Sequence, residues 1–304
     1  MSTEEIARIF LPISLAFIMF SMGLTLTLPD FMRLVRQPRD FLVGAVMQIV
    51  ILPIVTFGLV SIIPARPEIA VGFMLVAACP AGVTSTMLTH IGRGDLALSI
   101  MVTTFSSLVS IITLPIIVGW SLTHFMGTRA PELPLAATIL NIFAILVGPT
   151  ALGMAVARYF PSFAEWAEPK TRTLAMTLFA AVLVGAIVAK RGSFAYYIAV
   201  AAPIALALNF IMMCFAFVAA SWFASGPRQR TAITLECGVR NSALAIVIAV
   251  TMLHSLEISV PGAAYGVIML FMGFGFALWA AAQTKDEPAR RPPGGTLRRM
   301  HGPL

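Results

Sequence analysis

Nine stretches of this chain are apolar over about 20 residues or more, which is the length that one helix needs to cross a bilayer. They lie approximately at residues 8–28, 40–62, 69–91, 96–123, 134–157, 171–189, 194–224, 231–253 and 260–282. Charged residues make up only 11% of the chain, whereas soluble domains average about 25%. The sequence therefore predicts an all-α integral membrane protein with nine transmembrane helices.

The positions of the Lys and Arg residues predict how these helices are oriented. If the N-terminus lies outside, the inner loops and tail hold 14 of the 20 basic residues. The outer side then holds 5, which are Arg8, Arg66, Arg129, Lys190 and Arg191. This asymmetry follows the positive-inside rule. We therefore expect a multi-pass protein of the plasma (inner) membrane with a cytoplasmic C-terminus.

The connecting loops are too short to form a separate soluble domain, so residues 1–283 are expected to form a single transmembrane domain. Residues 284–304 are rich in Pro, Gly and Arg, and we expect a disordered basic tail that contacts anionic lipid. The net charge of +7 is spread over short loops and this tail, which does not indicate nucleic-acid binding. The three cysteines lie inside apolar segments without paired spacing, so they indicate neither a disulfide framework nor a metal site. No protein partner is predicted.

Two charged residues, Glu236 and Arg240, lie inside an apolar stretch, in the run Leu235–Ser242. An ionisable group at membrane depth costs at least a few kcal/mol, so it is usually paired or lines a functional cavity. The other acids and bases fall at or near segment ends, and Glu236 is therefore expected to be the only buried acid. This run is the strongest candidate for the functional site.

Two apolar segments share a short pattern of small and polar residues. Residues 81–86 read Ala-Gly-Val-Thr-Ser-Thr, and residues 237–242 read Cys-Gly-Val-Arg-Asn-Ser. The segments are five spans apart and would cross the membrane in opposite directions. Such a pattern is typical of inverted-repeat transporters, whose sites are built from two broken helices near the midplane. Alternatively, the small residues only allow helices to pack closely.

Several motifs together resemble the bile acid:sodium symporter family, which includes the apical sodium-dependent bile acid transporter. The motifs are Met22–Leu26, Asp30–Arg33, Gln48 with Pro53, Cys79–Ser85, Arg93–Ser99 with Thr103, and Glu236–Asn241. The resemblance extends from about residue 8 to 283. It implies a core domain of the spans near 40–123 and 194–282, and a panel domain of the spans near 8–28 and 134–189. The broken helices would cross in the core, and a substrate in the crevice between core and panel would be exposed alternately to each side.

The resemblance also implies a first sodium site on the broken helices and the span after the first of them. Its positions here are Ser85, Thr86, Ser99, Thr103 and Glu236. Sodium prefers oxygen ligands, which hydroxyls, a carboxylate and freed carbonyls can supply. Thr86 replaces an amide of the family pattern and changes the ligand geometry. Alternatively, the hydroxyls bond only the carbonyls of their own helices.

A second sodium site of the family matches this chain only in part. Gln48, Glu236 and the backbone of Cys237 and Val239 match, but Arg240 stands where the family has Gln. A guanidinium has no acceptor atom and cannot bind sodium. Arg240 could direct its charge at Glu236 and act as a tethered substitute for the ion. It could also form an inert ion pair with Glu236, or bind the carboxylate of a substrate.

Asn241 matches a substrate-facing amide of the family, and Thr84 and Arg240 are further candidates for substrate contacts. Phe271 and Met272 stand where relatives carry polar residues, which argues against a bile-acid-like binding mode. The predicted function is secondary active transport of a small organic anion, a carboxylate, a sulfonate or a sterol acid, coupled to sodium with one intact site.

Other functions remain open from the sequence. The carrier could be independent of sodium or coupled to protons, although a nearby arginine favours the ionised form of Glu236. A receptor or channel on the same scaffold is a further alternative. A membrane enzyme is not predicted, because no second acid, His or Cys is placed to work with Glu236.

Overall fold

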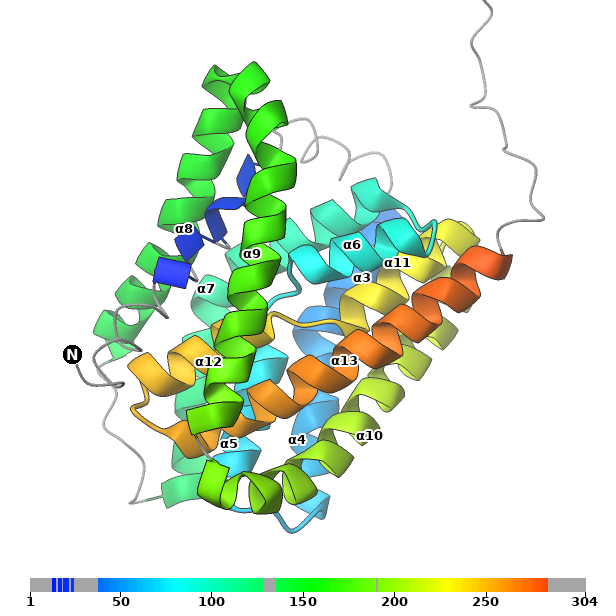
Figure 1. The fold of residues 1–304 in the computed structure, drawn as a ribbon. Coiled ribbons are helices and arrows are strands. Elements are labelled where there is room, and N and C mark those ends of the chain that lie inside the picture. Colours follow the sequence, from blue (N-terminus) through cyan, green and yellow to red (C-terminus); the bar gives the residue numbers. More distant parts are fainter. Residues whose placement is uncertain are drawn as a thin grey trace, which may run out of the picture.

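The computed structural model describes residues 13–14, 16–17, 19–21, 23–24, 38–127, 135–189 and 191–283. In these ranges all regular structure is helical (Figure 1). In chain order the longer elements are α3 (Pro38–Val46), the π-helix η1 (Met47–Ile51), α4 (Leu52–Ile62), α5 (Pro67–Ala78), α6 (Val83–Ile91), α7 (Leu96–Met126), α8 (Leu135–Tyr159), α9 (Pro161–Ala189), α10 (Arg191–Phe223), α11 (Pro227–Gly238), α12 (Ser242–Thr251) and α13 (Leu256–Gln283).

Five helical stretches of the described residues are long and apolar enough to cross a membrane: Pro38–Ile62, Leu96–Met126, Ala199–Phe223, Pro227–Thr251 and Leu256–Gln283. The bent pair α5 and α6 makes a sixth if it counts as one span. Helices satisfy their own backbone groups, as lipid requires, and the prediction of an all-α membrane protein is confirmed. Helices α8 and α9 cover the segments predicted near 134–157 and 171–189. The segment near 8–28 lies mostly outside the described residues, and the tail at 284–304 lies wholly outside them.

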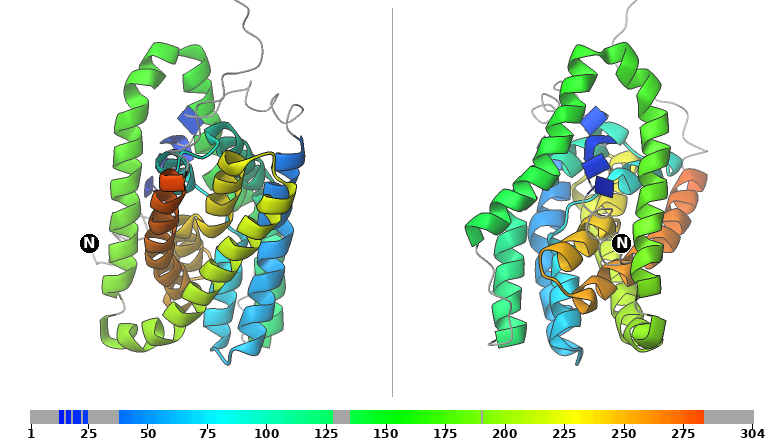
Figure 2. Two further views of the ribbon diagram at one scale, coloured as in Figure 1. Left: turned by 90° about the vertical axis from the view of Figure 1, so that its right-hand side faces the viewer. Right: turned by 60° about the vertical axis from the view of Figure 1, so that its left-hand side comes forward.

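The connection expected at residues 158–172 is largely helical, because α9 already begins at Pro161. Its first turns bury only a small face: Ala164 and Ala167 are buried, whereas Glu165 is exposed. The small buried face packs in a cluster with Leu24, so the charged residues do not end the helix here. Helices α8 and α9 form a long hairpin at one side of the molecule, beside the remaining bundle (Figure 2).

The first predicted break is present between α5 and α6, whose axes differ by 64°. Cys79 has an extended backbone, with φ −67° and ψ 141°. A residue before proline is pushed towards this conformation, and Pro80 itself cannot donate to the helix ladder. Gly82 is extended as well, and α6 begins directly after it.

The second predicted break lies between α11 and α12, where Val239 is extended with φ −108° and ψ 117°. The side chain of Asn241 caps α12 by accepting a hydrogen bond from the backbone N–H of Leu244 at 3.0 Å. The two halves bend less than those of the first break, and Pro227–Thr251 counts as one span.

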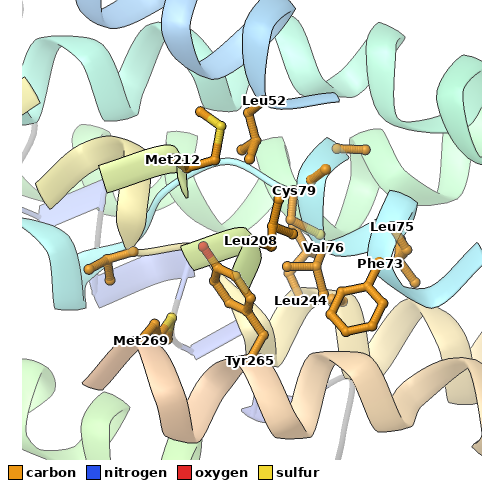
Figure 3. Close-up of a cluster of buried hydrophobic side chains, with 14 of the residues drawn as sticks. Leu52, Phe73, Leu75, Val76, Cys79, Leu208, Met212, Leu244, Tyr265 and Met269 are labelled. Atoms are coloured by element: carbon orange, nitrogen blue, oxygen red, sulfur yellow. The ribbon is translucent and has the colours of Figure 1, made fainter. Parts of the chain in front are cut away.

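The two breaks meet in the middle of the bundle. The backbone N–H of Asn241 donates to the carbonyl oxygen of Pro80 at 2.9 Å. Helix α6 packs beside α11, and α5 packs beside α12, as expected for two interrupted spans that cross. Figure 3 shows Cys79 of the first break among Leu52, Leu208 and Leu244, which come from three other helices.

Helix α13 lies closely against both halves of the first broken span. A Cβ at Gly72 of α5 would lie 2.5 Å from the carbonyl oxygen of Ile258, and a Cβ at Gly273 would lie 2.8 Å from Leu88 of α6. Helices in lipid associate through close van der Waals packing, which small residues permit. The lack of a Cβ at Gly72 and Gly273 therefore allows the continuous helix α13 to pack directly against the broken span.

The expectation that Glu236 is the only buried acid is wrong. Asp40, in the first turn of α3, is also buried, at 1% exposure. Its carboxylate accepts a hydrogen bond from the backbone N–H of Ser225, in the turn before α11, at 2.7 Å. Folding places this turn over the start of α3, so a residue at the end of an apolar segment need not face water.

Candidate functional site

The carboxylate of Glu236 is fully buried and accepts four side-chain hydrogen bonds. Oε1 accepts from Ser85 Oγ at 2.7 Å and from Ser99 Oγ at 2.6 Å. Oε2 accepts from Thr103 Oγ1 at 2.6 Å and from Gln48 Nε2 at 3.1 Å. Four donors on three spans therefore surround one carboxylate at the helix crossing, and charge-assisted bonds of this kind are the strong ones.

The elements around the crossing explain why these side chains meet. Ser85 lies in the first turn of α6, directly after the first break. Ser99 and Thr103 are four residues apart and share one face of α7, whose start is capped by Asp95 through a bond from Leu98 N. Ser85, Ser99, Thr103 and Glu236 thus come from the two broken spans and from the helix that follows the first of them.

Gln48 reaches the site from the π-helix η1. The wider turn is marked by a bond from Leu52 N to Met47 O, and it lies next to Pro53, whose ring clashes with a normal α-helical carbonyl. Such π-bulges are frequent at functional sites. Gln48 Nε2 also donates to the backbone oxygen of Glu236 at 3.0 Å. Two acceptors face the same amide nitrogen, so Gln48 acts here as a donor.

Of the residues expected at the first sodium site, Ser85, Ser99, Thr103 and Glu236 are brought together directly. Thr86 lies beside them, with its Oγ1 3.4 Å from Ser99 Oγ. Ser85 Oγ also contacts the carbonyl of Gly82 at 2.7 Å, but all three hydroxyl groups that reach Glu236 bond outside their own helices. These hydroxyl groups therefore do not bond only the carbonyls of their own helices.

Arg240 is buried, at 3% exposure, and does not pair with Glu236. Its Nη2 donates to the backbone carbonyls of Ala77, at 3.3 Å, and of Cys79. These carbonyls end α5, where the helix dipole is negative and an arginine is favourable. The guanidinium thus joins the second broken span to the first, and the ion pair with Glu236 that the sequence left open as one alternative is not formed.

Arg240 and Gln48 also line one small polar cavity, together with Ser106, Ser110 and Thr113 of α7. The Nε and Nη1 atoms of Arg240 and the Oε1 atom of Gln48 have no hydrogen-bond partner among the described residues. The cavity has room for about one water-sized group. Such a space suits hydration of these atoms rather than an organic anion.

The remaining candidates occupy different positions around the crossing. Cys237 and Val239 are fully buried, and the N–H of Val239 still donates to Leu235 O at the end of α11. The side chain of Asn241, at 7% exposure, caps α12. Thr84 is partly buried in the first turn of α6. Phe271 lies apart from this group, at 77% exposure.

Two buried residues at the second break were not singled out from the sequence. Asn209 of α10 and Tyr265 of α13 both donate to the carbonyl of Gly238. A signal for Asn209 was present, since it is the only amide side chain in the apolar stretch Ala199–Phe223. No sequence pattern indicated which backbone group it would contact.

Comparisons with known proteins agree with this architecture. A model of the "Sodium Bile acid symporter family" matches residues 12–196. The chain is 30% identical over 278 residues to "Probable sodium/metabolite cotransporter BASS2, chloroplastic" of Oryza sativa subsp. japonica, covering 88% of this chain and 62% of that protein. It therefore spans less than two thirds of the rice relative. It is 28% identical over 280 residues to "Uncharacterized sodium-dependent transporter YocS" of Bacillus subtilis (strain 168), covering 92% of this chain and 85% of that protein.

A third relative is the "Ileal sodium/bile acid cotransporter" of Oryctolagus cuniculus, which is 28% identical over 155 residues, covering 51% of this chain and 44% of that protein. These relatives are named as transporters, not enzymes. The matched region, together with the membrane helices and the crossing breaks, leads to one assignment: this chain is a membrane protein that belongs to the sodium bile acid symporter family.

Proposed function

We propose that this protein is a sodium-coupled carrier of a small organic anion that works by alternating access in the plasma membrane, with its N-terminus outside. The observation that carries the proposal is the buried carboxylate of Glu236, held by hydroxyl groups where two interrupted helices cross. Interrupted helices near the membrane midplane form the ion and substrate sites of many secondary transporters.

The surroundings of Glu236 suit a hard cation. Glu236 lies in the last turn of α11, where the helix dipole is negative and does not stabilise an anion. Hard cations prefer oxygen ligands, and the site offers the carboxylate with the hydroxyls of Ser85, Ser99 and Thr103. Thr86 is close enough to Ser99 to contribute a further oxygen. We propose that one sodium ion binds here.

Arg240 is proposed to replace a second ion. Its guanidinium bonds the carbonyls at the end of α5, an electronegative place that would otherwise attract a mobile cation. Gln48 presents its amide N–H groups to Glu236, so it offers a donor where a second sodium would need an oxygen. Cys237 and Val239 have no side-chain oxygen, and their backbone carbonyls alone would leave such a site incomplete.

The solute is proposed to bind beside the crossing, in a crevice between a core formed by α3–α7 and α10–α13 and a panel that contains α8 and α9. Asn241 and Thr84 lie at the breaks and are its proposed contacts. Direct binding of the solute by Arg240 is less well supported, because the cavity at this residue is about the size of a water molecule.

Flux measurements in proteoliposomes test this proposal. A panel of a short 2-oxo carboxylate, an aliphatic sulfonate and a bile acid is offered with an inward sodium gradient or with equal potassium. Saturable uptake that requires sodium and is lost in Glu236→Gln supports the carrier. Equal uptake in potassium contradicts sodium coupling, unsaturable flux indicates a channel, and binding without flux indicates a receptor.

Arg240→Gln tests the substitute-ion role in the same vesicles. We expect a sodium Hill coefficient near one in the wild-type protein and a higher value in this variant, since removal of the fixed charge permits a second ion. A sodium response identical to wild type would exclude this role for Arg240.

A further inference from the structure

The carbonyl group of Gly238 ends α11 and lies in the dry interior of the bundle. It accepts a hydrogen bond from Asn209 Nδ2 at 2.7 Å and another from Tyr265 Oη at 2.8 Å. Asn209 Nδ2 also lies 3.2 Å from Tyr265 Oη. Both side chains are fully buried. A terminal helix carbonyl has no partner within its own helix, so these two neighbouring helices supply its donors.

Helices α10 and α13 also contact the second break through two methionines. Met213 of α10 lies so close to Gly238 that a Cβ there would be 2.5 Å from its Cγ. Met269 of α13 is four residues after Tyr265, on the same helix face, and its sulfur accepts from the backbone N–H of Arg240 at 3.4 Å. The backbone from Gly238 to Arg240 is therefore fixed between α10 and α13.

Gly238 is only two residues from Glu236, so its position also sets that of the carboxylate. The bonds to this carboxylate from Ser99 and Thr103 are both 2.6 Å long and come from a different helix, α7. A small displacement of the end of α11 would lengthen them, because hydrogen bonds weaken steeply with distorted geometry.

We propose that Asn209 and Tyr265 are positioning residues that clamp the end of α11 and thereby set the affinity of the Glu236 site for its cation. They contact neither the ion nor the solute. The inference rests on the proposed function for the identity of the ion as sodium. It predicts that weakening the clamp changes the sodium concentration needed for half-maximal effect more than the maximal rate.

The test uses the full chain with Tyr265→Phe, which removes one donor and keeps the ring. The matched control is Ser259→Ala, which removes another buried hydroxyl of α13 that donates only to Leu256 O of its own helix. Thermal unfolding is titrated with sodium chloride against potassium chloride, and backbone hydrogen exchange is measured across residues 236–245. For Tyr265→Phe we expect the half-saturating sodium concentration to rise about threefold to tenfold, as for one lost hydrogen bond, with faster exchange after Gly238.

Ser259→Ala is expected to change neither the half-saturating sodium concentration nor the rate of hydrogen exchange after Gly238. The clamp is overturned if Tyr265→Phe keeps wild-type sodium affinity, or if Ser259→Ala shifts it equally. Asn209→Leu removes both amide contacts and is expected to raise the half-saturating sodium concentration more than Tyr265→Phe does. An unchanged half-saturating sodium concentration in Asn209→Leu also overturns the clamp. If wild-type protein shows no response to sodium, the proposed function fails, and hydrogen exchange alone decides the clamp: faster exchange in Tyr265→Phe sustains it and unchanged exchange overturns it.

Discussion

Replacing Thr103 by Val removes one of the four donors to Glu236 with little change of shape. The lost bond joins Thr103 Oγ1 to Oε2 at 2.6 Å, and it leaves Gln48 as the single side-chain donor to that oxygen. A hydrogen bond to a charged group contributes about 1.5–3 kcal/mol. For a large domain this corresponds to a melting temperature lower by about 3–12 °C. The variant also loses one proposed sodium ligand, so we expect the half-saturating sodium concentration to rise about tenfold or more.

The adjacent residue supplies a matched control. Thr104 is also buried, at 6% exposure, but its Oγ1 donates to Ile100 O of the same helix at 2.7 Å. Thr104→Val therefore removes a buried hydroxyl without touching Glu236. Thermal unfolding of both variants, with sodium and with potassium, is the assay. Equal effects of the two substitutions on stability and sodium affinity would refute the assignment of Thr103 to the site.

Three further outcomes are expected. Uptake of a monovalent anion with one sodium ion should carry no net charge, because the charges of the ion and the anion cancel; a sodium-driven current on a solid-supported membrane would contradict this stoichiometry. Gly153→Ala should lower the melting temperature, since the new Cβ would lie 2.3 Å from the carbonyl oxygen of Phe20, whereas Gly148→Ala, with nothing within 4 Å, should not. Gly94→Ala should also destabilise the protein in the same thermal assay, because its Cβ would lie 2.8 Å from Thr89 Cγ2 and 3.2 Å from the backbone nitrogen of Ala232; a melting temperature equal to that of the wild type would count against close packing between the α6–α7 turn and α11.

Residue chemistry alone indicated the membrane helices and the positions of both breaks. Apolar length determines which segments can cross a bilayer, and Pro80, Gly82 and Gly238 weaken a helix wherever such residues occur. The hydroxyl residues near Glu236 were likewise identified from motifs, although their convergence on one carboxylate depends on the crossing. By contrast, the burial of Asp40 depends on a turn that is distant in sequence.

Arg240 shows most clearly which contacts cannot be predicted from neighbouring residues in the sequence. Residues four apart face each other on a continuous helix, and an ion pair between Glu236 and Arg240 was one of three roles that the sequence left open for the arginine. Helix α11 ends at Gly238, so this spacing no longer places the two side chains together. The sequence determined that a carboxylate and a guanidinium would lie within the membrane and that the helix between them would be interrupted. Only the tertiary structure decided their partners, because the donors and acceptors that satisfy them come from helices remote in the chain.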